Sequence, residues 1–298
     1  MEYTKRSLSI SQQIQQLKDR GLIIADDDFA SRILSNVSYF RLANYMRTCE
    51  IDLATHQFKQ GTTFESIIKM YDFDTELRNL LFTAIQTIEI SFRTKLIHIF
   101  SQTYGAFWYV DMNLTNDGRK FLENLSALDR EISRSKEDFI KEHFQKYDKP
   151  AFPPVWKSLE LATFGILSKF YFNFADIKLK KQIARELGLP QHLILESWIT
   201  TISAMRNYCA HHSRIWNRSF PSVPELPKNL KNSWITDFSF PTNKVYAQIV
   251  IIAYLQNVIK DGDTFTKGVM SLMKNYTTID PFAMGFPKCW QTEPMWSI

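Results

Sequence analysis

Helical periodicity in the first half of the chain is the strongest constraint on the fold. Between Leu77 and Ile99, apolar residues recur at intervals of three and four, the spacing of an amphipathic helix. Glu89 and Arg93 are four residues apart on the other face of this helix, where an ion pair is expected. The only hint of an extended piece is the stretch THQFKQGTTF. We therefore predict a long core helix and an all-α fold.

Helical patterns also recur along most of the remaining chain. They predict helices in the stretches SISQQIQQLKDRGLII, DDDFASRILSNVSYFRLANYMR (as a single helix), EDFIKEHFQKY, PPVWKSLELATFGILSKFYFNF and DIKLKKQIARELGL, and around residues 245–259 and 264–275. The Pro-rich stretch FPSVPELPKN predicts a loop, and PFAMGFPKCWQTEPMWSI predicts an irregular aromatic tail.

Composition and cysteine usage indicate a globular protein of a reducing compartment. Hydrophobic residues make up 45% of the 298 residues and charged residues 22%. The three cysteines, Cys49, Cys209 and Cys289, are far apart, which supports neither a disulfide framework nor a structural zinc site. The N-terminus lacks the apolar run of a signal peptide, and VYAQIVIIAYLQNVI is too short to span a bilayer. We expect a cytoplasmic protein with no membrane partner.

Positive charge is concentrated in one part of the chain. The net charge is 36 minus 31, or +5, which is compatible with a polyanionic partner. Between Arg206 and Lys231 there are five basic residues and one acid, Glu225, so this segment alone carries +4.

The basic segment begins within a helix that is expected to start near His192. Its apolar stripe consists of Leu195, Trp198, Ile199, Ile202, Met205 and Cys209. Its opposite, polar stripe consists of Glu196, Thr200, Ser203, Asn207, His211, Arg214 and Arg218. The first stripe is expected to pack in the core, whereas the second is not needed for packing and is available for a function. Arg206 lies about 140° around the helix from His211, so its side chain must bend across a cleft to work with it.

Arg, Asn and His without carboxylates suit RNA cleavage by the neighbouring 2′-hydroxyl. Histidine can shuttle the proton near neutral pH, and arginine can stabilise charge on the phosphorane oxygens. No metal or other cofactor is needed, and the 2′-hydroxyl nucleophile selects RNA over DNA.

The same residues permit three other interpretations. Arg and His near the C-terminal end of a helix often cap its carbonyls, and spacing alone does not separate such a cap from a catalyst. A zinc site is disfavoured because His211 and His212 point about 100° apart on a helix. A Cys209–His211 nucleophile pair is disfavoured because Cys209 falls on the apolar stripe.

The stretch RNYCAHH has the R-N-x-x-x-H form of the HEPN ribonuclease superfamily, in Arg206, Asn207 and His211. Its continuation SRIWNR is similar to the Abi-like abortive-infection proteins, the AbiD and AbiF group. Other stretches resemble that family in the same order, so the resemblance covers nearly the whole chain: SISQQIQQLKDRGLII, VSYFRLANYM, FESIIKMYDFDTELRNLLFTAIQTIEISFRT, WKSLELATFGILSKFY and MGFPKCW.

The resemblance implies a HEPN-like helical bundle and a toxin-like ribonuclease of phage defence. The corresponding division is an N-terminal helical segment over 1–60, a HEPN-like core over 61–276 and an irregular tail over 277–298. HEPN sites are commonly built where two motif helices face each other, so a homodimer is expected. Family members are also associated with a partner noncoding RNA. On this interpretation Arg206, Asn207 and His211 are catalytic, and Arg214, Arg218 and His212 bind RNA.

A second R-x4-H stretch, RTKLIH, places His98 after Arg93. It lacks the Asn, and His98 is flanked by apolar positions, so we interpret it as a chance match. Glu89 and Arg93 can instead form an ion pair that supports the motif helix, or a structural salt bridge.

Two further hypotheses do not involve catalysis. The first is a non-catalytic RNA-binding protein that holds a structured noncoding RNA with the same basic surface. The second, ranked last, is a DNA-binding regulator in which the helices between Ser11 and Arg47 mimic a helix-turn-helix. Trp216 and Phe220 offer stacking surfaces for RNA, but packing beneath the Pro-rich loop is the preferred interpretation.

Overall fold

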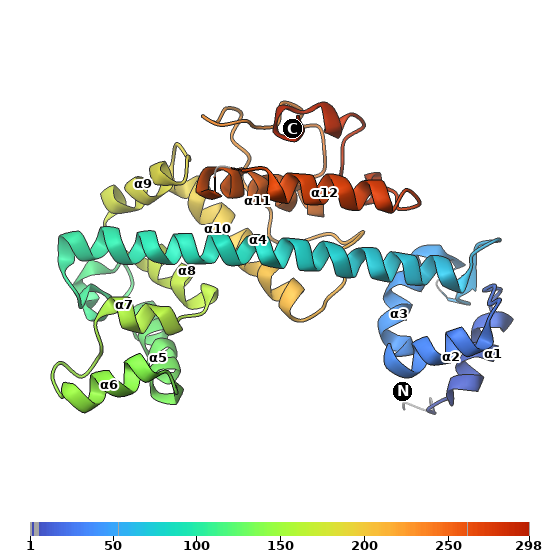
Figure 1. Cartoon of the computed structure of the whole chain (residues 1–298), viewed down its shortest axis with the longest axis horizontal. Helices are drawn as coiled ribbons and strands as arrows, with labels where there is room; N and C mark the ends of the chain where they lie inside the picture. Colours follow the sequence, from blue (N-terminus) through green and yellow to red (C-terminus); the bar gives the residue numbers. More distant parts are fainter. Residues whose placement is uncertain (1, 3–5, 53, 261, 298) are drawn as a thin grey trace. The chain divides into compact units, whose positions relative to one another are not determined.

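The protein is almost entirely helical, which confirms the predicted all-α class. The computed structural model describes residues 2, 6–52, 54–260 and 262–297. These residues form twelve α-helices and one two-stranded antiparallel sheet (Figure 1). None of the helices described is both long enough and apolar enough to cross a membrane.

The elements follow the order of the sequence patterns closely. The helices are α1 (Ile10–Asp19), α2 (Asp27–Asn36), α3 (Tyr39–Met46), α4 (Phe64–Tyr104), α5 (Gly118–Arg134), α6 (Asp138–Lys146), α7 (Val155–Ser158), α8 (Phe164–Asn173), α9 (Ile177–Glu186), α10 (His192–Ala210), α11 (Val245–Lys260) and α12 (Thr264–Asn275). The strands are β1 (Glu50–Asp52) and β2 (Gln57–Phe58), and β2 lies in the stretch with the extended signal. The tail contains short 3-10 turns, among them Phe282–Met284 and Trp290–Thr292.

The prediction of one helix over DDDFASRILSNVSYFRLANYMR is wrong. The chain leaves the helix at Val37, whose backbone is extended, and α3 begins two residues later. The hydroxyl of Ser38 accepts the backbone N–H of Arg41 at 3.3 Å, so this serine caps a new helix. Similarly, the stretch PPVWKSLELATFGILSKFYFNF divides into α7 and α8, because Thr163 caps α8 through the N–H of Ile166.

The chain forms two compact units. Unit 1 consists of Met1–Arg78 with Leu272–Ile279, and unit 2 of Asn79–Ser271 with Asp280–Ile298. The boundary falls inside the continuous helix α4. The division at residues 60 and 276 remains a prediction.

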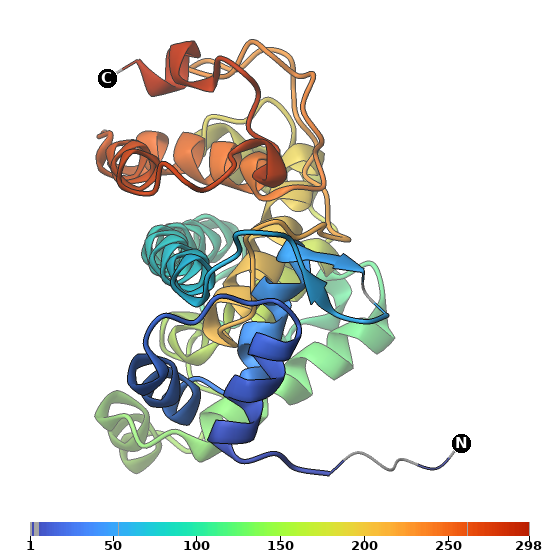
Figure 2. The same cartoon turned by 90° about the vertical axis from the view of Figure 1, so that its right-hand side faces the viewer.

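Unit 1 is held together by a buried polar network between α3 and α4. The hydroxyl of Tyr45 donates to Oδ2 of Asp74 at 2.6 Å, and Asp74 pairs with the guanidinium of Arg78. All three side chains are buried, and burial raises the pKa of Tyr45. Outside this network, β1 and β2 pair in a small antiparallel hairpin (Figure 2).

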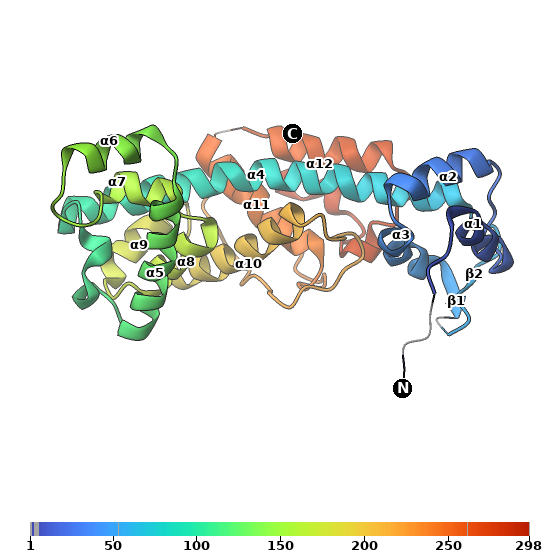
Figure 3. The same ribbon diagram turned by 90° about the horizontal axis from the view of Figure 1, so that it is seen from below.

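Unit 2 is organised around a helix that is buried on every side. In α11, each residue from Val245 to Gln256 is buried, and the amide of Gln256 donates to the carbonyl of Ala84 on α4 at 2.6 Å. On the same stretch of α4, Phe92 makes an edge contact with Tyr171 of α8, with ring centroids 5.2 Å apart. Helix α10 packs against α8, α9 and α11 (Figure 3), which fixes where its C-terminal end emerges.

Candidate functional site

Helix α10 buries the apolar stripe expected from its sequence. Its six apolar positions are all at most 5% exposed: Leu195, Trp198, Ile199, Ile202, Met205 and Cys209. On the polar side, the buried ammonium of Lys180 donates to the carboxylate of Glu196 at 2.9 Å. Glu196 is therefore a structural partner of α9. Asn207 and His211, near the end of the stripe, are exposed.

The helix ends in a cap that the two histidines form with their backbones. The N–H of Ser213 donates to the carbonyl of Tyr208 at 2.9 Å, and the N–H of His212 to the carbonyl of Cys209 at 3.0 Å. This pair of bonds is a Schellman motif. His212 occupies its left-handed position with a φ of 53°, where glycine is usual. Backbone N–H groups form this cap, so the interpretation in which Arg and His side chains cap the helix carbonyls stays a prediction.

The prediction that Arg214 and Arg218 continue the polar stripe is wrong. Helix α10 stops at Ala210, and the left-handed residue His212 turns the chain away from the helix axis. Arg214 and Arg218 therefore belong to the loop after the cap, and both are half-buried.

The three motif residues differ in their surroundings. The half-buried guanidinium of Arg206 lies 5.9 Å from the ring centroid of Phe82 on α4, within the range of a cation–π interaction. Asn207 and His211 are exposed and four residues apart, and the N–H of His211 donates to the carbonyl of Asn207 at 3.0 Å. The structure thus presents a histidine and an amide to solvent, with Arg206 packed over Phe82 at the neighbouring face.

A stacked cation lies beside the motif. The guanidinium of Arg218 lies 4.4 Å from the ring centroid of Tyr208, and its NH1 group donates to the carbonyl of Arg214 at 3.4 Å. The ring of Tyr208 in turn makes an edge contact with Phe220, at 5.4 Å between centroids. Because two contacts hold Arg218, the loop presents this cation in a defined position next to α10.

Trp216 and Phe220 belong to the core. Their exposed fractions are 5% and 4%, and the N–H of Phe220 donates to the carbonyl of Asn243 at 2.8 Å. Packing, the preferred interpretation of these two aromatic residues, is therefore correct.

Glu89 and Arg93 form a structural link between α4 and the segment before α8. Arg93 donates to Glu89 at 3.0 Å, to the carbonyl of Leu159 at 3.0 Å and to the carbonyl of Ala162 at 3.0 Å. Both side chains are largely buried, at 11% and 15% exposure. These contacts favour the structural role of the pair over support of the motif helix.

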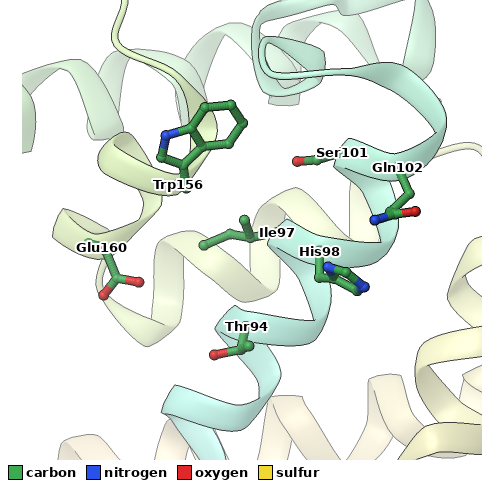
Figure 4. Close-up of a pocket in the computed structure, with 7 residues that line it drawn as sticks. All are labelled: Thr94, Ile97, His98, Ser101, Gln102, Trp156 and Glu160. Atoms are coloured by element: carbon green, nitrogen blue, oxygen red, sulfur yellow. The ribbon is translucent and has the colours of Figure 1, made fainter.

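Arg93 and His98, the two residues of the second R-x4-H stretch, have different surroundings in the structure. Arg93 is engaged with the carbonyls before α8, and His98 is exposed. His98 lies at the edge of an open pocket of ≈ 350 Å³ between α4 and Trp156 of α7. In Figure 4, Ile97 and Ser101 project toward the side of Trp156 and Glu160, whereas His98 projects away from them.

Sequence reasoning missed two residues beside the motif. Tyr208 lies between Asn207 and Cys209, and it is the platform for Arg218. Phe82 lies on the long helix α4 and is the platform for Arg206. An aromatic residue inside a basic motif was a usable signal for Tyr208. No local signal pointed to Phe82, because its contact depends on how α4 and α10 pack.

A comparison with known protein families shows to which family the chain belongs. Residues 32–217 match the family described as Abi-like protein, and this is more than half of the 298 residues. The chain belongs to the Abi-like family. Membership indicates a role in abortive infection, the bacterial defence against phages. Comparison with curated proteins gave no match, and neither did comparison with solved structures.

The Abi-like match extends from α2 to just beyond the cap of α10. It includes Arg206, Asn207, His211 and Arg214, and it ends one residue before Arg218. The region shared with the family therefore contains the whole R-N-x-x-x-H stretch and the turn that presents it.

Proposed function

We propose that this Abi-like protein is a metal-independent endoribonuclease of the HEPN type, whose site is formed by Arg206, Asn207 and His211. The observation that carries the proposal is the exposed pair Asn207 and His211 at the end of α10, with a half-buried arginine at the adjacent position. An exposed imidazole at a helix terminus, on the same helix as a cation that is held by packing, is suited to chemistry on a phosphodiester.

In this mechanism the ribose 2′-hydroxyl of the RNA attacks the adjacent phosphorus. His211 accepts or donates the proton, the role that imidazole side chains most often take in general acid–base catalysis. Arg206 stabilises negative charge on the phosphorane oxygens, and its packing against Phe82 limits the reorganisation needed to do so. Asn207 orients the phosphate through its amide. The products are an RNA with a 2′,3′-cyclic phosphate end and an RNA with a 5′-hydroxyl.

We propose that a second copy of the chain completes this site. Arg206 and His211 lie about 140° apart around an ideal helix, so one α10 presents them to different sides. In a dimer, the same motif on the partner copy would face this helix and contact the side of the phosphate that one α10 does not reach. We therefore propose a homodimer with a composite site, as the resemblance to HEPN proteins implies.

Arg218 and Arg214 are proposed to hold the RNA beside the site. The stack of Arg218 on Tyr208 keeps the guanidinium at the end of α10, where it can contact a phosphate near the one that is cleaved. His212 is exposed at the same cap. Arg214 and Arg218 supply two of the five positive charges between residues 206 and 231.

The first experiment compares wild-type protein with His211→Ala and Arg206→Ala, in cells and as purified proteins. Host growth and total RNA integrity are measured with and without phage. Each substitution is expected to lower RNA cleavage by about 10²–10⁴-fold, the usual contribution of a general acid–base group or of a transition-state charge partner. EDTA should leave the cleavage unchanged, and 2′-deoxy substitution at the cleaved position should abolish it.

His98→Ala is the matched control for this experiment. It removes an exposed histidine from the other R-x4-H stretch and should leave cleavage at the wild-type rate. Circular dichroism establishes that each variant folds. Equal cleavage by wild type, His211→Ala and Arg206→Ala would overturn the proposed site.

A second candidate function is non-catalytic binding of a structured noncoding RNA. The contact of Arg218 with Tyr208, supported by the edge contact of Tyr208 with Phe220, favours it, because it presents a cation to an RNA backbone without requiring His211. On this alternative, His211→Ala keeps phage protection, whereas charge reversal at Arg218 abolishes RNA binding.

A further inference from the structure

A pocket of ≈ 450 Å³ lies between α5 and α8, and none of the motif residues lines it. One wall is the N-terminal part of α5, which was not predicted from the sequence, and the other is the C-terminal part of α8. The volume is within the range of about 300–1,000 Å³ that is typical of small-molecule sites.

The rim of this pocket is fixed before any ligand binds. The N–H of Asn116 donates to the carbonyl of Asn173 at 2.8 Å, and the N–H of Ala175 donates to the carbonyl of Leu114 at 2.9 Å. The amide of Asn173 also closes a pair of bonds with the backbone of Asp117, at 2.8 and 3.0 Å. The loop before α5 is therefore pinned to the end of α8, which preorganises the pocket.

Asn124 gives the pocket wall an unsatisfied hydrogen-bond acceptor. Its side chain is only 4% exposed, and its amide group donates weakly to the carbonyl of Ile166 at 3.5 Å. Among the residues that the structure describes, its Oδ1 has no hydrogen-bond partner. An unpaired buried polar atom is costly, and because this oxygen is itself shielded from solvent, the Asn124 amide must turn into the pocket for a ligand N–H to satisfy it.

The charges around the pocket favour an anion. Asp117 accepts the backbone N–H groups of Arg119 and Lys120 as the N-cap of α5, and the bond from Lys120 holds the pKa of this carboxyl below its usual value. Glu123 pairs with Arg119 at 3.5 Å. Lys120 itself pairs with Asp117, with 3.6 Å between Nζ and Oδ2, so among the lining residues that the structure describes, the exposed ammonium of Lys169 is the cation outside these ion pairs and attracts a ligand first.

Phe172 adds an apolar face to these polar groups. It lines the pocket from α8 and is half-buried. An aromatic ring can stack on a planar heterocycle, an amide oxygen accepts an N–H from its edge, and lysines contact a phosphate. No other common small ligand combines these three requirements as directly as a nucleotide.

We propose that the pocket between α5 and α8 binds a 5′-phosphorylated nucleoside, with its base on Phe172 and Asn124 and its phosphate on Lys120 and Lys169. The nucleoside is either a free nucleotide or the phosphorylated 5′ end of an RNA. This site is separate from the proposed cleavage residues, and its occupancy does not depend on catalysis.

The test is a calorimetric titration of the full chain with AMP, GMP, CMP and UMP. Adenosine and ribose 5-phosphate serve as probes of the two halves of the ligand. Lys169→Glu and Asn124→Leu are each expected to weaken binding of the preferred nucleotide about tenfold or more, because each removes a direct contact. Lys178→Glu reverses an exposed charge on α9, outside the pocket, and should leave the affinity unchanged.

The source of the nucleoside is identified with short RNAs, on protein carrying His211→Ala so that no RNA is cut. Competition by 5′-phosphorylated RNA, but not by 5′-hydroxyl RNA, assigns the pocket to an RNA end. Competition by neither assigns it to a free nucleotide. Absence of any binding at about 1 mM nucleotide, or equal binding by all variants, overturns the proposal. Neither result bears on RNA cleavage, which is measured separately.

Discussion

At the scale of single residues, the neighbouring histidines of the motif have different physical roles. His211 ends α10 with an ordinary backbone, whereas His212 has a φ of 53° in the left-handed region. A residue with a Cβ atom is strained there by about 1 kcal/mol relative to glycine. The turn directly after His211 therefore involves local backbone strain at His212.

This strain predicts the relative stability of two variants. His212→Gly and His212→Ala both remove the imidazole and its contacts, so their difference isolates the backbone. We expect His212→Gly to be more stable than His212→Ala by about 1 kcal/mol in urea unfolding. At Gln182, an exposed position within α9, the alanine variant should instead be more stable than the glycine variant by a similar amount, because alanine is the better helix former. The same order at both positions would contradict the strain at His212.

The sequence predicts which residues of α10 are buried, but it does not predict which side chains contact each other across helices. The apolar stripe of α10 follows from local periodicity, so its burial could be read from the sequence. The contact of Arg206 with Phe82 joins residues 124 positions apart, 206 minus 82, and depends on helix packing. Partners of this kind require the three-dimensional structure.

At the scale of elements, Arg93 connects the long helix to the start of α8. Its guanidinium satisfies two backbone carbonyls, those of Leu159 and Ala162, as well as Glu89. The carbonyl of Leu159 also accepts the N–H of Ala162 at 3.1 Å, so Arg93 adds a second bond there, and its charge-assisted bond to the carbonyl of Ala162 fixes the segment before α8.

Substitution of Arg93 should therefore reduce stability more than substitution of its ion-pair partner. We expect Arg93→Ala to lower the free energy of unfolding by about 3 kcal/mol, because it removes the cation that pairs with the largely buried carboxylate of Glu89 and the donor to the carbonyl of Ala162. Glu89→Gln keeps an acceptor for Arg93 and should cost about 1 kcal/mol or less. Urea unfolding measures both. A wild-type midpoint for Arg93→Ala, together with lost RNA cleavage, would show instead that the pair supports the motif.

The boundaries of the helices show how accurately local sequence patterns predict where a helix begins and ends. Helix α12 was predicted with the bounds that the structure shows, and α11 to within one residue. Helix α5 was missed, although Asp117 is a strong N-cap signal ahead of it. The break between α2 and α3 was also missed, because Ser38 is as compatible with a helix surface as with a cap.

At the scale of the whole molecule, the fold class followed from the sequence because helical periodicity is local and recurs in nearly every segment. The composition of the two units did not follow, because Leu272–Ile279 joins a unit formed mainly by the first 78 residues. Charge is also a property of the whole chain. The excess of +5 is modest, and +4 of it falls in one segment, which makes RNA affinity sensitive to a few residues there.

That concentration of charge predicts how RNA affinity depends on salt. On single-stranded RNA, each phosphate contact contributes about −0.7 to the slope of log K against log salt concentration. With the His211→Ala protein as a non-cleaving reference, Arg218→Ala should make the slope shallower by about 0.7. Arg134→Ala, at the exposed end of α5, removes the same charge and should leave the slope unchanged. If both variants keep the reference slope, Arg218 serves only to pack on Tyr208, and the RNA must bind elsewhere on the protein.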